Sequence, residues 1–111
     1  MYKRQVLREA ARRLKSAARR YDSVGRYGGE EFLIVLPGCD ASDAAVQAER
    51  MRDAVGATPF FTGSQPVLVT ASLGVACSSH GAPGALVREA DDALYGAKAK
   101  GRNQVVVHSL A

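Results

Sequence analysis

Apolar positions recur along this chain with two different periods, and these periods predict helices and strands. Residues 6–20 carry small apolar side chains at every third or fourth position, with arginine and lysine on the opposite side, which is typical of an amphipathic helix. Residues 41–55, with Asp40 or Ser42 as the cap, and residues 85–99 repeat this spacing. On the second helix, the side chains expected to face the core are Ala45, Ala48, Met51, Arg52 and Val55.

The shorter period of two indicates extended segments between the helices. Residues 67–76 alternate apolar side chains toward one face, as a strand does, and residues 104–108 form a last strand. Gly74, inside the first of these, suggests a bulge or a close approach of another backbone.

Two further extended runs predict a β-hairpin. Residues 24–27 and 32–36 flank Gly28 and Gly29, and glycine supplies the positive φ angles that a tight turn demands. The predicted order is therefore helix, strand, strand, helix, strand, helix, strand.

Length and composition narrow the class of protein. The chain has 111 residues and 47% apolar residues, which suits one packed domain. We expect no transmembrane helix and no secretory leader. Cys39 and Cys77 lie outside any CxxC pair, so we expect neither a disulfide framework nor a zinc site, and a cytoplasmic location fits.

Charge is concentrated at the N-terminus. Residues 1–20 hold eight Lys or Arg and one Glu, giving +7, whereas the rest of the chain sums to −3. This basic helix could contact phosphates, or it could simply be a solvated face. No aromatic residues interleave with the charges, so a nucleic-acid partner is not expected.

The candidate chemistry begins at the predicted hairpin turn. Gly28 and Gly29 are followed directly by Glu30 and Glu31. Bare glycines allow a polyanion to come close, and Mg²⁺ commonly takes one or two carboxylates together with phosphate oxygens. The alternative is an ordinary solvated hairpin.

The motifs around this turn resemble those of the GGDEF diguanylate cyclase family. RYGGEEF (residues 26–32) is similar to the family signature in its GGEEF form, and VTASLGVA (residues 69–76) is similar to a later family strand. The segments VLREAARRL, LIVLPG and ADDALYGAKAKGRNQVVV match in the same order. The resemblance covers residues 6–108 and implies an α/β (α+β) sandwich, a nucleotidyl-cyclase-like, ferredoxin-like palm with an antiparallel-type sheet.

The resemblance also implies an activity and its site. Such domains condense two GTP into cyclic di-GMP and pyrophosphate as a homodimer, with Mg²⁺ or Mn²⁺. Glu30 and Glu31 would be metal ligands, and Glu30 could also activate the attacking hydroxyl. Gly28 and Gly29 would let the ribose and α-phosphate approach.

Two further pairs of charged residues match family positions. Lys98 and Arg102, on either side of the helix-ending Gly101, match the phosphate-binding Lys and Arg, although basic residues there also favour the helix dipole. Arg19 and Asp22 form an RxxD pattern, with Asp22 six residues before Gly28, and this is similar to the family's inhibitory site for cyclic di-GMP. The alternative for this pair is an ordinary ion pair at a helix end.

Some family features have no counterpart here. The first strand and helix of the family, with a metal-binding Asp and a guanine-binding Asn, are missing, and Lys3 and Arg4 do not fit the Gly-Asp expected near them. MYKRQ is what a sequencing-library transposon end encodes. We therefore expect residues 1–5 to be a non-native leader and residues 6–111 to be a partial GGDEF domain, inactive alone.

Three functions remain open from the sequence. The first is a diguanylate cyclase whose full-length parent carries an upstream sensory domain and is membrane-anchored or free. The second is a non-enzymatic cyclic di-GMP receptor module that uses Arg19 and Asp22. The intact acid pair favours the cyclase, because a pure receptor has no need for it. The third is a basic nucleic-acid-binding module, which ranks well below the others and predicts salt-dependent DNA binding that survives removal of Glu30 and Glu31.

Overall fold

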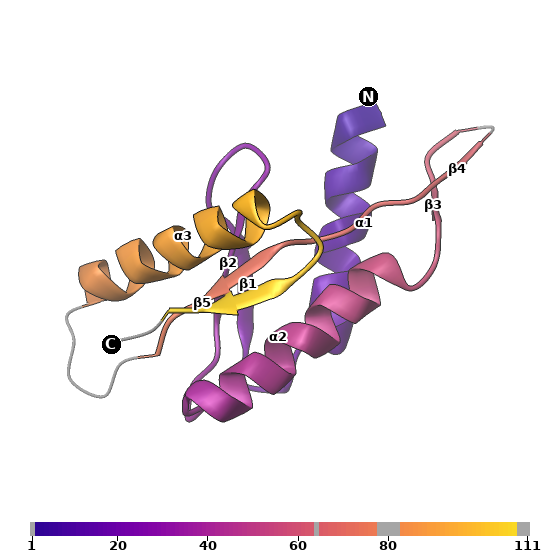
Figure 1. The fold of residues 1–111 in the computed structure, drawn as a ribbon. Helices are drawn as coiled ribbons and strands as arrows, with labels where there is room; N and C mark the ends of the chain where they lie inside the picture. The colour runs from indigo at the N-terminus through magenta and orange to yellow at the C-terminus, as the bar shows by residue number, and fades with distance from the viewer. Residues whose placement is uncertain (1, 64, 78–82, 109–111) are drawn as a thin grey trace.

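The computed structural model describes residues 2–63, 65–77 and 83–108, as a mixed α/β domain (Figure 1). The elements in chain order are α1 (Tyr2–Ala17), β1 (Ser23–Arg26), β2 (Phe32–Val35), α2 (Ala41–Gly56), β3 (Phe60–Phe61), β4 (Pro66–Val67), β5 (Leu73–Val75), α3 (Pro83–Ala99) and β6 (Val105–Val107). This order confirms the predicted succession of helices and strands and adds the short β3–β4 hairpin.

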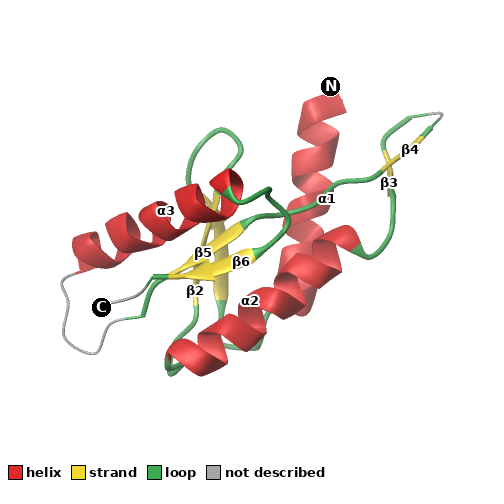
Figure 2. Cartoon of the chain, in the orientation of Figure 1, coloured by secondary structure: helices red, strands yellow, loops and turns green. Residues whose placement is uncertain are grey.

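The strands pair in three separate two-stranded sheets. β1 with β2 and β3 with β4 are antiparallel, whereas β5 and β6 are parallel because α3 carries the chain back between them. Figure 2 shows α2 and α3 on opposite sides of the β5–β6 pair, while α1 packs against α2 and β1. The mixed α/β class is confirmed, although the expected antiparallel pairing does not extend to β5 and β6.

The first helix is displaced from its predicted bounds of 6–20. It ends at Ala17 because the Asp22 carboxylate accepts a hydrogen bond from the Arg19 backbone N–H at 2.7 Å, which holds the chain in a turn before β1. It begins at Tyr2, so the described part of the expected leader, residues 2–5, is helical.

The predicted strand over residues 67–76 is too long. Only Pro66–Val67 and Leu73–Val75 have strand partners, and these are β3 and β6. Extended backbone counts as a strand only where a neighbouring strand accepts and donates its hydrogen bonds, and residues 68–72 have no such neighbour. Alternation of side chains reveals one buried face but does not reveal the pairing.

The core is centred on α2. Met51 and Val55 of this helix and Phe60 of β3 are the largest fully buried side chains. Asp40 is the cap, since its carboxylate accepts from the Asp43 backbone N–H at 2.8 Å. The predicted core face of α2 is rotated, since Ala44 and Gln47 are buried whereas Ala45 is only half-buried. Arg52 lies at the edge of this face, where its long stem is expected.

Gly74 is the point of closest contact between β5 and α3. A Cβ at this position would lie 2.2 Å from both the Ala90 carbonyl oxygen and the Leu94 backbone nitrogen. The predicted close backbone approach is confirmed, and it explains why a glycine stands inside this strand.

Arg13 is a buried charge that joins three elements. Its guanidinium donates to the carbonyl oxygens of Val55, Thr58 and Pro59 at 2.8, 2.6 and 2.9 Å, and it lies 4.0 Å from the centre of the Phe60 ring. It thereby holds α1 against the C-terminal end of α2, where carbonyl groups lack helical partners. In residues 2–63, 65–77 and 83–108, no helix is both long and apolar enough to cross a membrane.

Candidate active site

The two candidate carboxylates lie on the loop that joins β1 to β2. The ladder closes with Arg26 opposite Phe32, and the backbone N–H groups of Tyr27 and Gly28 both donate to the Glu31 carbonyl oxygen, at 2.9 and 3.3 Å. The Arg26 guanidinium donates to the Gly29 carbonyl oxygen at 2.6 Å. Backbone hydrogen bonds therefore hold the base of the loop, and the Arg26 side chain holds its tip at Gly29.

Gly28 and Gly29 do not supply the positive φ angles that the sequence predicted for this turn. Positive φ among the described glycines occurs at Gly38 and Gly101, and not at Gly28 or Gly29, because the loop spans five residues and is not a two-residue turn. A Cβ at Gly29 would meet nothing within 4 Å, and at Gly28 the nearest atom is Glu31 Oε1 at 3.8 Å. The chain's own packing does not demand glycine here, which leaves an open surface for an incoming group.

Each carboxylate faces a lysine from another element. Lys3 Nζ of α1 lies 2.7 Å from Glu30 Oε1, and Lys98 Nζ of α3 lies 3.8 Å from Glu31 Oε2. The Lys3 ammonium, by hydrogen bond and charge, lowers the pKa of Glu30 below its usual range, with a smaller contribution from Lys98. Glu30 therefore loses its proton more readily than a free glutamate does, and 67% of its side chain is exposed.

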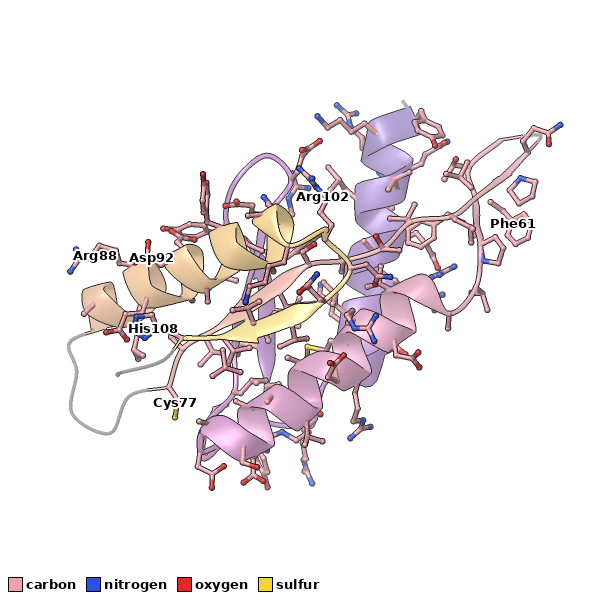
Figure 3. All side chains as sticks on the ribbon, viewed as in Figure 1. Phe61, Cys77, Arg88, Asp92, Arg102 and His108 are labelled. Carbon is pink, nitrogen blue, oxygen red and sulfur yellow. The ribbon has the colours of Figure 1, made fainter. Side chains whose placement is uncertain are left out.

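The end of α3 presents the candidate phosphate-binding residues beside this loop. Lys98 reaches Glu31, and Figure 3 shows Arg102 just beyond the helix end, on the side of the β1–β2 loop. The helix closes with hydrogen bonds from Gly101 N to Lys98 O at 3.3 Å and from Arg102 N to Ala97 O at 3.0 Å, which is the Schellman pattern. The predicted C′ role of Gly101, with φ of 116°, is confirmed.

The backbone after Gly101 is strained. Arg102 and Asn103 have φ of 63° and 51°, values that residues with a Cβ seldom adopt. Two hydrogen bonds hold this conformation in place: Asn103 N donates to Ser72 Oγ at 3.1 Å, and Asn103 Oδ1 accepts from Arg52 at 2.8 Å. Such strain concentrates at functional sites.

The RxxD pair lies at the other end of β1. The Arg19 guanidinium donates to both oxygens of Asp22, at 2.7 to 3.2 Å, and to the Pro37 carbonyl oxygen at 3.1 Å. The Asp22 side chain is fully buried, whereas 38% of the Arg19 side chain is exposed. Hydrogen bonding to Arg19 is the main cause that lowers the pKa of Asp22. Arg19 is therefore the member of the pair that can reach a ligand, and Asp22 orients it.

Sequence reasoning missed two residues of these sites. Gln47 is buried on α2 and donates to the Ala17 carbonyl oxygen at 2.8 Å and to Asp22 Oδ2 at 3.3 Å, so it supports the RxxD pair. Gln47 lies outside the core face predicted for this helix, so no sequence signal pointed to it. Arg26, the first residue of the RYGGEEF motif, donates to the carbonyl oxygen of Gly29 within the hairpin loop, a role that the motif alone did not predict.

The donor chemistry of the loop fits a hard divalent cation. Glu30 and Glu31 supply carboxylate oxygens, and Mg²⁺ typically takes one or two carboxylates and completes its shell with phosphate oxygens and water. No group of three or more His, Cys, Asp or Glu suited to a metal occurs among the described residues. A cation held here would depend on substrate oxygens for the rest of its ligands.

Comparison with known proteins agrees with the fold and identifies the family. Residues 4–104 match the family model described as diguanylate cyclase, GGDEF domain, and the chain belongs to this family. It is 44% identical over 106 residues to the response regulator PleD of Caulobacter vibrioides, covering 92% of this chain and 23% of that protein. It is 39% identical to diguanylate cyclase A of Treponema denticola, covering 92% of this chain and 28% of that protein.

Solved structures show the same fold. The GGDEF domain of DgcB from Caulobacter crescentus, in complex with c-di-GMP, superposes with a TM-score of 0.85 at 30% identity, covering 94% of this chain and 63% of that one. The active GGEEF domain of a diguanylate cyclase from Vibrio cholerae gives 0.82 at 30% identity, with 97% and 69% covered. By contrast, the chain spans only about a quarter of the length of the two curated relatives named above.

Proposed function

We propose that this chain contributes the catalytic loop of a diguanylate cyclase, which condenses two GTP into cyclic di-GMP and two pyrophosphates. The observation that carries the proposal is the meeting of Glu31 on the β1–β2 loop with Lys98 at the end of α3, 3.8 Å apart. Acidic and basic groups that converge beside open glycines suit a polyphosphate and its cation.

The roles of the residues follow from their positions. Glu30 and Glu31 would hold Mg²⁺ or Mn²⁺, which when bound neutralises phosphate charge and orients the reacting groups. Lys98 and Arg102 would grip the polyphosphate, and Gly28 and Gly29 would leave room for the ribose and α-phosphate. Glu30 would accept the proton of the attacking hydroxyl once Lys3 has moved from it.

The reaction needs two such sites face to face. The 3′-hydroxyl of each GTP attacks the α-phosphorus of the other, so two phosphodiester bonds form and two pyrophosphates leave. One loop holds one GTP, and a homodimer would supply both halves. We propose a cytoplasmic site of action, where GTP is available, with an upstream sensory domain in the parent protein.

A receptor is the second candidate function. It is favoured by the preformed arrangement of Arg19, Asp22 and Gln47, which could bind cyclic di-GMP without any chemistry at the loop. In the cyclase, the same arrangement would be an inhibitory site. β1 separates it from the catalytic loop by about 13 Å of strand.

A chimera separates the two functions. Residues 4–104 of this chain would replace the aligned segment of the active Vibrio cholerae GGEEF domain. With GTP and Mg²⁺, chromatography should detect cyclic di-GMP and pyrophosphate in a ratio of about one to two, as the reaction balance requires. A chimera that binds cyclic di-GMP but leaves GTP unchanged would support the receptor and reject the cyclase.

A further inference from the structure

The two cysteines of the chain meet although they lie far apart in sequence. Cys39 stands between β2 and α2, and Cys77 follows the end of β5, where Figure 3 shows it beside the start of α2. The Cys77 thiol lies 3.4 Å from the Cys39 carbonyl oxygen. The Cys77 sulfur therefore contacts the backbone of Cys39 directly, and the two cysteines are neighbours in the fold although 38 positions separate them.

The surroundings of the pair favour thiol chemistry. Both cysteines are free and only half-buried, so a small oxidant can reach them. Reactive cysteines occur in partly exposed, electropositive places, and Arg19 is the nearby cation. Asp22 is the main cause that raises the pKa of the Arg19 guanidinium, and Cys39 is close enough to add to it.

We propose that Cys39 and Cys77 are a redox modification site, at which a peroxide converts the two thiols into an intramolecular disulfide. One thiol attacks hydrogen peroxide and becomes a sulfenic acid, releasing one water. The second thiol attacks the sulfenic sulfur, forms the S–S bond and releases a second water. The pair loses two electrons and two hydrogens, and the peroxide takes both.

The bond would be regulatory and not part of a structural framework. It would tie the end of β5 to the loop before α2, and this loop also contains the Pro37 carbonyl oxygen that accepts from Arg19. Disulfides that form transiently in reducing compartments typically serve redox sensing. The proposal does not depend on the cyclase reaction.

The test compares disulfide formation in the folded and unfolded chain. The chimera that carries residues 4–104 is treated with hydrogen peroxide in native buffer and in concentrated guanidinium chloride, and the Cys39–Cys77 peptide is followed over time by mass spectrometry. Because the fold holds the two residues together, the native protein should form the bond about tenfold faster or more. Equal rates in the two solvents would overturn the proposal.

Two variants control for other oxidation products. Cys39→Ser and Cys77→Ser each remove one partner of the bond, so the remaining thiol should accumulate as sulfenic or higher acids and form no intramolecular disulfide. If the native wild-type chain instead yields disulfide-linked dimers or sulfinic acid with no intramolecular bond, the proposal is also overturned.

Discussion

Three arginine side chains make multiple or long-range hydrogen bonds in this chain, and each guanidinium group donates to a different kind of acceptor. Arg13 donates to backbone carbonyls in the core, Arg19 donates to a buried carboxylate, and Arg26 donates to a carbonyl oxygen of the β1–β2 loop. Lysine could not reproduce these contacts, because its single ammonium lacks the planar set of donors. Arg19 and Arg26 lie at the candidate sites, whereas Arg13 stabilises the core.

Arg19 is the residue on which proposed product binding depends. In the chimera, Arg19→Ala should weaken cyclic di-GMP binding about tenfold or more, equivalent to about 1.4 kcal/mol, because the exposed donors of the guanidinium are lost. Calorimetry measures the change. Arg20→Ala, at the neighbouring exposed position, should leave affinity within about twofold, since a surface charge contributes little. Equal binding by wild type and Arg19→Ala would remove this site.

At the scale of elements, the close packing of α3 on β5 requires a glycine at position 74. Gly74→Ala would push a methyl group into the backbone of α3, where the nearest atoms stand only 2.2 Å away. The cost should be about 3 kcal/mol or more, because backbone cannot yield as a side chain can. Urea unfolding of the chimera measures it.

Gly25→Ala is the matched control for that substitution. Gly25 is also a strand glycine, in β1, but a Cβ there meets nothing within 4 Å. Its unfolding free energy should change by less than about 1 kcal/mol. Equal losses for the two variants would show that the contact between β5 and α3 is looser than described.

Arg13 links α1 to the end of α2 and gives a second test at this scale. Arg13→Met removes the donors of three carbonyl oxygens in the core and should cost about 3 kcal/mol in urea unfolding of the chimera. Arg12→Met removes only an exposed ion pair with Glu9 and should cost less than about 1 kcal/mol. Similar losses in both would contradict the bridging role.

Sequence predicted the helices better than the strands for a physical reason. A helix closes its hydrogen bonds within itself, so spacing and the cap at Asp40 were enough to locate α2. A strand forms its hydrogen bonds with another strand, and the local sequence does not show which strand that is. Residues 67–76 therefore divided between β4, which pairs with β3, and β5, which pairs with β6.

At the scale of the whole molecule, the described strands form three separate two-stranded sheets and no continuous one. β2 and β5 each pair on one side only within the described ranges. Val35, in β2, is 52% exposed, and Leu68, directly after β4, is 77% exposed. Burying such a side chain contributes roughly 1.5–3 kcal/mol, a large share of a domain's net stability of about 5–15 kcal/mol. The elements described here leave part of their own apolar surface uncovered.

Residues 1–111 alone should therefore fold weakly and show no cyclase activity. The carboxylate pair alone offers a cation too few ligands for a fixed clamp, and open strand edges promote association. Circular dichroism during heating and a GTP assay test this directly. A monomer with a cooperative transition and measurable cyclic di-GMP synthesis would contradict it.

The sites were predictable from sequence only in part. The signature placed Glu30 and Glu31 on a hairpin loop, and the structure adds that Lys98 meets that loop. The burial of Asp22 and its support by Gln47 depend on how α1, β1 and α2 pack. Such long-range contacts have no local signal, so they required the structure.

Turnover of GTP by the chimera with and without the Glu30 carboxylate tests the central claim most directly. Glu30→Gln keeps the shape of the loop but removes a charge needed to hold the cation, so cyclic di-GMP synthesis should fall by about a hundredfold or more. Asp91→Asn, at an exposed position on α3, should leave turnover unchanged. Normal synthesis by Glu30→Gln would contradict the assignment of this loop as the catalytic centre.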